Sequence, residues 1–325
     1  MKCALLIYPH ANVRYRESMK KLAAAELCMT GAAGIVFAKI GGLELLCFEG
    51  DEVICQKVQR LSCAQAVFKL QGNTLVPMME GYEPYLSGDM PGILKYKGKT
   101  NDSFTRLLIN ASLMASNSEG ENKNILDPMC GRGTSMFSAL SAGHNGYGID
   151  IDKKDFEQFK TFTLQYLKFH RMKHNVKTGS YTGNGRQAGV FFRVSTAAEP
   201  DAYASGDTRT IEMVKGDTRD AALIYKKGRF DAIVADLPYG VQHRAEAERL
   251  NIGSLLEKAA PVWLSLLKPG CAMAIAFNSY TLKREAAEQA LTKAGAEIMG
   301  GCYADMEHWV EQAVMRDVVV AKRCD

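Results

Sequence analysis

The chain has 325 residues, of which 47% are hydrophobic and 23% are charged, with a formal net charge of +4 at pH 7. These values are ordinary for a globular protein that buries a full core, and they argue against a disordered chain. The length favours a large domain plus a smaller one. No apolar run approaches the roughly 20 residues that span a bilayer, and the first residues lack a signal-peptide pattern, so we expect a cytoplasmic protein with no membrane contact.

The first 93 residues alternate patterns typical of strands and helices. Extended segments are predicted over 3–9 and 34–48, and helices over 16–27 and 53–70. This alternation indicates a small α/β domain over 1–93 with a possible role in substrate binding. The segment 80–100 is rich in glycine and proline and is typical of a linker. We therefore place the domain boundary near residue 93.

From residue 94 onward, helical and extended patterns alternate to the end of the chain. Helices are predicted over 102–116, 134–143 and 155–172, and strands over 124–128, 146–151, 210–217, 230–238, 271–278, 296–303 and 313–323. Strands that are apolar on both faces and alternate with helices indicate a parallel sheet covered by helices. The interval 177–208, rich in Gly, Ser and Thr, interrupts this rhythm and predicts a long surface insertion that is mobile unless something binds it.

Three of the predicted strands end in acids that match the parts of one ligand. Ligands of open parallel sheets bind at the carboxyl ends of the strands. Asp127, before the turn glycines Gly131 and Gly133, can accept from a ligand ammonium. Asp150 can accept from ribose hydroxyls and Asp217 from the adenine amine, although each is also a candidate helix cap. Together they predict S-adenosylmethionine.

The turn after the first of these strands also argues against another nucleotide cofactor. A dinucleotide-binding GxGxxG motif needs a third glycine where this chain has Met136. A nicotinamide or flavin cofactor is therefore disfavoured.

A fourth strand ends FDAIVADLPYG, a grouping suited to methylation of an amino nitrogen. The Asp236 carboxylate and the Leu237 carbonyl can each accept one N–H of a base, which favours a pyramidal nitrogen with an available lone pair. Pro238 lacks an N–H and biases Leu237 toward an extended conformation, which directs that carbonyl outward. Tyr239 can stack on the base, and Gly240 leaves room beside it.

This grouping resembles the acid-x-Pro-aromatic motif of class I amino-methyltransferases. Together with DPMCGRGT, GYGIDID, GDTRD and the closing VMRDVVVAK, it is similar to the tRNA guanine-N2 methyltransferases that usually carry a THUMP RNA-binding domain, over roughly residues 93 to 325. The resemblance implies a Rossmann-like, seven-stranded class I methyltransferase domain over 94–325 that methylates guanine-N2 in tRNA. It also implies that Lys99, Thr100 and Thr105 line the methionine end of the cofactor pocket.

Two departures from this family pattern are visible. Leu237 stands where the commonest motif has its first proline, which keeps the carbonyl. The first 93 residues are too few for the usual ferredoxin-like plus THUMP pair, so a partner protein is a candidate source of RNA binding.

Other functions fit the sequence less well. An adenine methyltransferase acting on DNA or rRNA shares the motif, but we find no target-recognition region of the DNA enzymes. A glutamine methyltransferase usually begins the motif with Asn. A non-catalytic RNA-binding scaffold is expected to lose Asp236 or the cofactor glycines, which this chain keeps.

Residues 158 to 198 contain no acid, and their basic residues are candidates for RNA contact. The four that we select, hereafter the basic quartet, are Lys168, Arg171, Lys173 and Lys177. His170 and His174 have helical i,i+4 spacing, but with cationic neighbours they indicate a solvated basic face and not a zinc site. No metal is expected.

The nine cysteines are an odd number, are widely spread and include no CxxC pair. This pattern predicts reduced, mostly buried thiols and neither a disulfide nor a zinc site.

Overall fold

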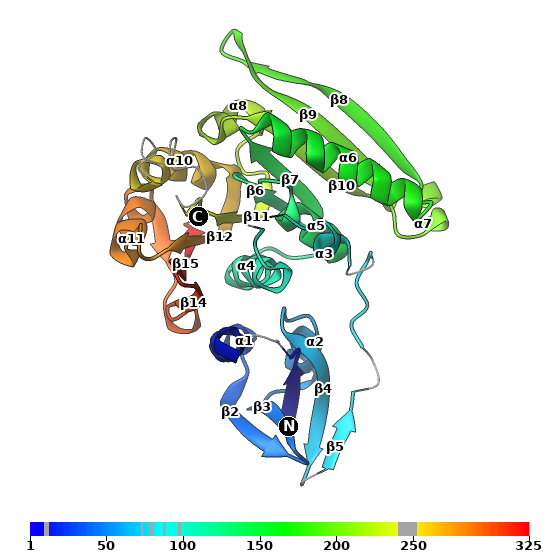
Figure 1. Cartoon of the computed structure of the whole chain (residues 1–325), viewed down its shortest axis with the longest axis vertical. Helices are drawn as coiled ribbons and strands as arrows, with labels where there is room; N and C mark the ends of the chain where they lie inside the picture. The colour runs from blue at the N-terminus through cyan, green and yellow to red at the C-terminus, as the bar shows by residue number, and fades with distance from the viewer. Residues whose placement is uncertain are drawn as a thin grey trace.

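The computed structural model describes residues 1–9, 13–72, 74–78, 81–86, 89–96, 99–239 and 252–324. These residues form two units, each built on its own sheet (Figure 1). We call residues 2–77 the small unit and the residues from 102 onward the large unit. The predicted boundary near residue 93 stays a prediction, although the only regular element between the two units in the described residues is the short helix α3 (Met90–Ile93).

The small unit is an antiparallel sheet with two helices. Its elements are β1 (Lys2–Ile7), α1 (Val13–Met29), β2 (Ala33–Ile40), β3 (Leu43–Glu49), α2 (Glu52–Gln59), β4 (Ala64–Gln71) and β5 (Thr74–Pro77). The spatial order is β2-β3-β1-β4-β5. The run from β1 to β4 is a split β-α-β arrangement of the ferredoxin-like kind. The predicted small α/β unit is therefore present.

Two details of the small unit differ from the sequence prediction. The extended segment 34–48 is a hairpin, because Gly41 and Gly42 turn the chain at φ of +57° and +83°. The predicted helix over 53–70 is wrong in its second half, since α2 ends at Gln59 and β4 follows. The buried carboxylate of Glu26 accepts hydrogen bonds from the N–H and hydroxyl of Ser62, which holds the chain in a turn where the helix was expected to continue.

The large unit contains a ten-stranded sheet with the order β13-β15-β12-β11-β6-β7-β10-β9-β8, and β14 pairs with β15. Its strands in chain order are β6 (Asn124–Asp127), β7 (Asn145–Asp150), β8 (His174–Gly183), β9 (Arg186–Thr196), β10 (Arg209–Gly216), β11 (Phe230–Asp236), β12 (Leu267–Asn278), β13 (Ala296–Ile298), β14 (His308–Glu311) and β15 (Val314–Arg323). The pairs among β10, β7, β6, β11 and β12 are parallel, with the 3-2-1-4-5 order of a doubly wound sheet. With β13 and β15 they make the seven strands that were predicted.

Three strands extend this predicted core. β8 and β9 form a hairpin whose second strand pairs with β10 over eight residues, so the prediction of an irregular insertion over 177–208 is wrong. Phe192 and Val194 of β9 are buried against the sheet, whereas β8 is exposed along most of its length. Figure 1 shows this hairpin at the end of the sheet that lies farthest from the small unit. The third added strand is β14.

Helices cover both faces of the large sheet. One face packs against α8 (Ala221–Ile224), α10 (Ile252–Leu266) and α11 (Arg284–Lys293), and the other against α4 (Asp102–Ala115), α5 (Thr134–Ser141) and α6 (Lys153–Phe169). Shorter helices are α7 (Pro200–Ser205), η1 (Thr218–Asp220) and η2 (Gly301–Tyr303). Within the described residues, no helix is long and apolar enough to cross a membrane.

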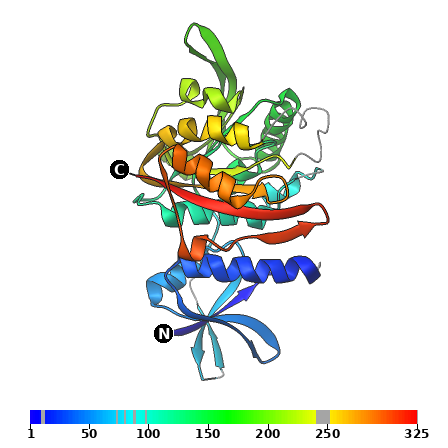
Figure 2. The same ribbon diagram turned by 90° about the vertical axis from the view of Figure 1, so that its left-hand side faces the viewer.

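The two units meet along α1. This helix contacts α4, β14 and η2, and Figure 2 shows it lying beneath β14. Glu26 on α1 accepts a hydrogen bond of 2.7 Å from Asn110 Nδ2 on α4 while it also holds Ser62. The Arg60 carbonyl accepts from both Asn110 and Arg106 of α4. A buried, hydrogen-bonded carboxylate therefore joins the small unit to the large one.

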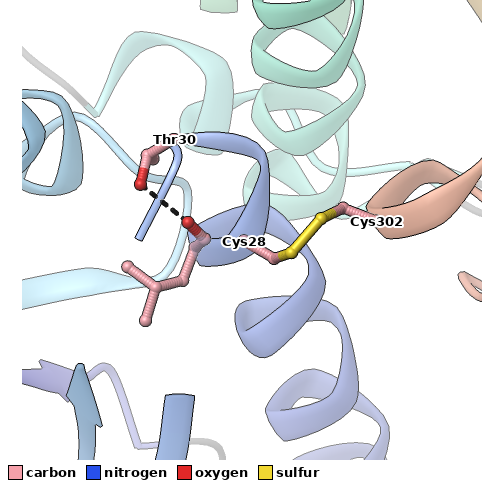
Figure 3. The surroundings of a disulfide bond; sticks show 4 residues. Cys28, Thr30 and Cys302 are labelled. Atoms are coloured by element: carbon pink, nitrogen blue, oxygen red, sulfur yellow. Dashed lines mark hydrogen bonds between the residues drawn. A yellow bond between two sulfur atoms is a disulfide. The ribbon is translucent and has the colours of Figure 1, made fainter. Parts of the chain in front are cut away.

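A disulfide joins the units at the same helix. Cys28 at the end of α1 is bonded to Cys302 of η2 (Figure 3). The prediction that all nine cysteines are reduced is therefore wrong for this pair, which is separated by 274 positions in the chain and brought together only by the packing of α1 on η2. The other seven are free thiols.

Candidate cofactor and catalytic site

The turn after β6 has the glycines that the sequence prediction required. Gly131 and Gly133 have φ of +51° and +86°, a region that favours glycine, and Gly133 caps the N-terminus of α5. A Cβ on Gly133 would lie 2.6 Å from Phe159 Cδ2 on α6. A Cβ on Gly131 would have no described atom within 4 Å. Gly133 therefore serves close packing of the helix, whereas Gly131 leaves its backbone open to a ligand.

Asp127 is a buried carboxylate at the end of β6. It accepts a hydrogen bond of 3.0 Å from the Met129 N–H and another from the Ser135 hydroxyl. Burial, with smaller contributions from the carboxylates of Asp150 and Asp236, raises its pKa to about 7. A cation placed beside Asp127 would relieve this desolvation and repulsion.

Asp150, at the end of β7, holds the glycine turn. One carboxylate oxygen accepts from the Gly131 N–H at 2.8 Å, and the other accepts from the Asp152 N–H at 2.9 Å. Burial raises the pKa of Asp150 to about 6. Asp152 instead caps α6 by accepting from the Lys154 and Asp155 N–H groups. The two acids thus differ in role, and Asp150 is the one beside the turn.

Asp217 follows the end of β10 and interacts with Arg219, two residues later in the chain. It caps η1 by accepting from the Arg219 N–H, and its carboxylate pairs with the Arg219 guanidinium at 2.5 Å. This hydrogen bonding lowers the pKa of Asp217. The helix-cap alternative is therefore what the structure shows, and contact with adenine stays a prediction.

Asp236, at the end of β11, is the centre of a hydrogen-bonded cluster. The Thr100 hydroxyl donates to Oδ2 at 2.5 Å, and the Tyr239 hydroxyl donates to Oδ1. Arg316 of β15 donates from Nε to the Tyr239 hydroxyl and places Nη2 3.5 Å from Asp236 Oδ2. Its guanidinium carbon lies 4.3 Å from the centre of the Phe104 ring. The side chain of Asp236 is thus held by groups from three different parts of the chain.

The rest of the motif is held by the neighbouring strand. The Leu237 N–H donates to the Ala276 carbonyl of β12 at 2.8 Å, and the Leu237 side chain is buried. Pro238 is exposed and Tyr239 is partly buried. Gly240 lies outside the described residues.

Arg316 is a member of the cluster that was not among the predicted site residues, although it lies within the segment VMRDVVVAK. Only the pairing of β15 with β12, which sets Arg316 opposite Asn278, brings it to the end of β11. Of the candidates in the segment before the first core strand, Thr100 reaches Asp236, whereas Thr105 is buried and donates to the Asn101 carbonyl of its own helix. Lys99 pairs with Asp102 at 2.7 Å.

The basic quartet begins near the amino ends of the parallel strands, away from the strand-end acids, and its last member, Lys177, is level with Glu212 in the middle of β10. His174 of β8 pairs with Thr196 of β9, and Thr196 pairs with Arg209 at the start of β10. Lys173 is therefore level with the beginning of β10, whereas Asp217 follows the end of that strand. Eight residues of strand separate these levels by roughly 26 Å. All four side chains are exposed, and none pairs with a carboxylate of a described residue. His170 caps α6 and His174 begins β8, so the helical spacing predicted for the two histidines is wrong.

A family model of the RMKL-like methyltransferase domain matches residues 106–302, which is more than half of the chain. The chain belongs to this family. It is accordingly a class I methyltransferase that uses S-adenosylmethionine, as the strand-end acids and the glycine turn predicted. The acidic strand ends of this RMKL-like methyltransferase fit that cofactor, because Asp127 and Asp150 are buried acids whose raised pKa values fall when a cationic ligand approaches.

Several solved structures resemble this methyltransferase at low sequence identity. TrmN from Thermus thermophilus is 18% identical with a TM-score of 0.43, over 77% of this chain and 56% of that chain. A TehB-like SAM-dependent methyltransferase from Corynebacterium glutamicum is 16% identical with a TM-score of 0.38, over 66% and 85%. A SAM-dependent methyltransferase from Methanosarcina mazei is 14% identical with a TM-score of 0.40, over 64% and 95%. The chain thus spans little more than half of the length of TrmN, and no curated protein matches it.

Proposed function

We propose that this methyltransferase acts on an exocyclic amino group of a nucleobase in RNA, and that its substrate is guanine-N2 in tRNA. The observation that carries the proposal is the fixed Asp236 carboxylate at the end of β11, followed by a backbone carbonyl, a proline and an aromatic ring. The proposal places the enzyme in the cytoplasm, with tRNA as its partner.

The acids at the strand ends would hold the cofactor. Asp127 accepts from the ammonium of the methionine moiety, Asp150 from the ribose and Asp217 from adenine, while Gly131 allows close approach of the backbone. When bound, S-adenosylmethionine supplies a methyl group on a positively charged sulfonium. Asp217 takes part only if the Arg219 guanidinium shares its carboxylate with the adenine amine, because both oxygens now accept from Arg219.

Asp236 would orient the amine of the base. Its carboxylate and the Leu237 carbonyl each accept one N–H, which directs the nitrogen lone pair toward the methyl group and stabilises the positive charge that develops on nitrogen. Pro238 keeps the carbonyl outward and Tyr239 stacks on the base. The Tyr239 hydroxyl now donates to Asp236, so an incoming amine shares the carboxylate with it. Arg316 contacts both the Tyr239 hydroxyl and the Asp236 carboxylate and so fixes their relative positions.

RNA would be held at several places. The basic quartet is exposed and can contact phosphates, and an RNA that reaches both Lys173 and the carboxyl ends of the strands must extend over roughly 26 Å along the sheet. We propose a substrate-holding role for residues 1–93 as well, with a partner protein as an additional source of RNA binding.

Substitution of Asp236 tests the proposal. Asp236→Ala removes an interaction that is strongest in the transition state, and we expect a loss of roughly 100- to 1000-fold in the rate of methyl transfer with cofactor binding retained. Asp236→Asn keeps a carbonyl acceptor and should lose less. Asp201→Ala, an exposed acid on α7, is the matched control. The measurement is single-turnover transfer from labelled cofactor to purified tRNA, and a wild-type rate for Asp236→Ala would contradict the proposal.

A further inference from the structure

A cleft of about 650 Å³ lies between the small unit and the large unit, apart from the strand-end acids. Tyr8 and Gln65 line it from the small unit, Tyr82 from the connecting segment, and Asp102 and Arg106 from α4. Its volume is within the range of 300–1,000 Å³ that is usual for small-ligand sites. Neither the cofactor nor the amine that is methylated requires this cleft, so its lining needs a separate explanation.

The lining combines aromatic rings with the cation Arg106, and Arg60 lies beside Tyr82. The Arg60 and Arg106 guanidinium carbons lie 5.6 Å and 5.0 Å from the centre of the Tyr82 ring, which keeps two positive charges beside an aromatic surface. Tyr8 is 61% exposed and needs no movement to offer its ring to a ligand. Tyrosine rings stack on bases of any sequence while arginine contacts the phosphates, and this pairing is typical of single-stranded nucleic-acid sites.

The polar residues of the cleft suit the same ligand. Gln65 is exposed and carries both a donor and an acceptor, so it can pair with the edge of an unstacked base. Asp102 is the acid among the lining residues, and Lys99 Nζ lies 2.7 Å from its carboxylate. With that acid neutralised, Arg106 makes the charge of the lining positive, and Arg60 adds a second positive charge beside Tyr82.

The cleft begins next to the catalytic cluster. Asp102 faces the cleft at the first turn of α4, and Thr100, two residues earlier, donates to Asp236. Two residues of extended chain span about 7 Å. The part of the cleft at Asp102 is therefore separated from Asp236 by a distance on the order of one or two nucleotides.

We propose that this cleft binds an unpaired segment of the RNA substrate beside the nucleotide that is methylated, with its bases on Tyr8 and Tyr82 and its phosphates near Arg60 and Arg106. The inference rests on the proposed function, because it names how the same RNA is held. It assigns to the junction of the two units a role separate from that of the basic quartet.

The probe is a fluorescein-labelled hexauridylate, and its affinity is measured by fluorescence anisotropy with the full chain. We expect Tyr8→Ala with Gln65→Ala to weaken binding by at least about fivefold, the effect of one lost base stack. Tyr8→Phe should bind as the wild type does, because it keeps the ring. The control is Phe37→Ala, an exposed aromatic on β2 at the other edge of the small sheet, which should change affinity less than twofold or so.

Equal affinity of the wild type and the double variant, with melting temperature and cofactor affinity unchanged, would overturn the inference, as would a wild type that does not bind the probe. Labelled transfer to tRNA separates this outcome from failure of the proposed function. If the double variant methylates tRNA as well as the wild type does and Asp236→Ala does not, the proposed function stands and the cleft site is wrong. If no RNA is methylated while probe binding still depends on Tyr8, the reaction is wrong and the cleft site stands.

Discussion

We predict that the buried acid at the end of β6 makes cofactor affinity depend on pH. The pKa of Asp127 is raised to about 7, chiefly by burial and further by the carboxylates of Asp150 and Asp236. Below pH 7 the free protein therefore carries a proton on Asp127. A cationic ligand whose ammonium pairs with this carboxylate must displace that proton, so its observed affinity falls by about tenfold for each pH unit well below 7.

The expected change is large enough to measure by calorimetry. For one group with a pKa of about 7 that must be ionised, the Kd of S-adenosylhomocysteine should be about 30-fold weaker at pH 5.5 than at pH 8. Binding at pH 5.5 should also release close to one proton, which appears as a dependence of the binding enthalpy on the ionisation enthalpy of the buffer. The ammonium of this product is the same as that of the cofactor.

The same pKa has a consequence of opposite sign for stability without ligand. A pKa that is higher in the folded chain than in the unfolded chain means that the folded chain holds the proton more tightly. The contribution of Asp127 to stability therefore falls as pH rises from about 4 to about 7, by on the order of 4 kcal/mol for a rise of about three units from 3.8. The melting temperature of the free protein should drop over this range, and ligand should restore it more at pH 8 than at pH 5.5.

Asp127→Asn is the control for both measurements. The variant keeps an acceptor and has no proton to lose, so its Kd should be nearly independent of pH between 5.5 and 8 while being weaker than wild type at pH 8. Because the pKa of Asp150 is raised to about 6, the Kd of this variant should still change slightly with pH near pH 5.5. A wild-type Kd that does not change between pH 5.5 and pH 8 would refute the argument that Asp127 meets the ammonium as a carboxylate.

Three further predictions concern other parts of the molecule. Arg316→Met removes a donor to the hydrogen-bonded cluster around Asp236, and we expect the rate of transfer to fall by about 10-fold or more with little change in cofactor Kd, whereas an unchanged rate would remove Arg316 from the proposed site. Neutralising the basic quartet should reduce the slope of log K against log salt for tRNA binding by roughly 0.7 to 0.9 for each phosphate that the protein no longer neutralises, and an unchanged slope would leave the quartet as a solvated surface. Gly148→Ala places a Cβ 2.3 Å from Met136 Sδ and should lower stability by about 1–3 kcal/mol in thermal or urea unfolding. Gly300→Ala, where a Cβ meets no described atom within 4 Å, is its control, and equal stability of the two variants would contradict the crowding argument.

The sequence predicted the large sheet well, because its parallel strands are apolar on both faces and end in chemically distinctive residues. Asp127, Asp150 and Asp236 occupy strand ends as expected, and Asp150 contacts the glycine turn directly. Such signals are local, since a strand and the turn that follows it are contiguous in the chain. They fix which residues reach the carboxyl edge of the sheet.

Features that depend on distant parts of the chain escaped prediction. The exposed strand β8 has no apolar face, so its polar segment looked irregular until its pairing with β9 was known. The helix expected to run past Gln59 stops because Glu26, on another helix, holds Ser62. Arg316 reaches the hydrogen-bonded cluster around Asp236 because of the register in which β15 pairs with β12. Periodicity and motif spacing carry no information on such long-range contacts.

The carboxylate of Glu26 also determines how the two units respond to stress. It is fully buried, its pKa is raised by that burial, and its hydrogen bonds come from Ser62 on one side and Asn110 on the other. Swinging the small unit away would break the hydrogen bond from Asn110 on α4 and open the packing that buries Glu26. We therefore expect heat or denaturant to melt the two units in a single cooperative transition.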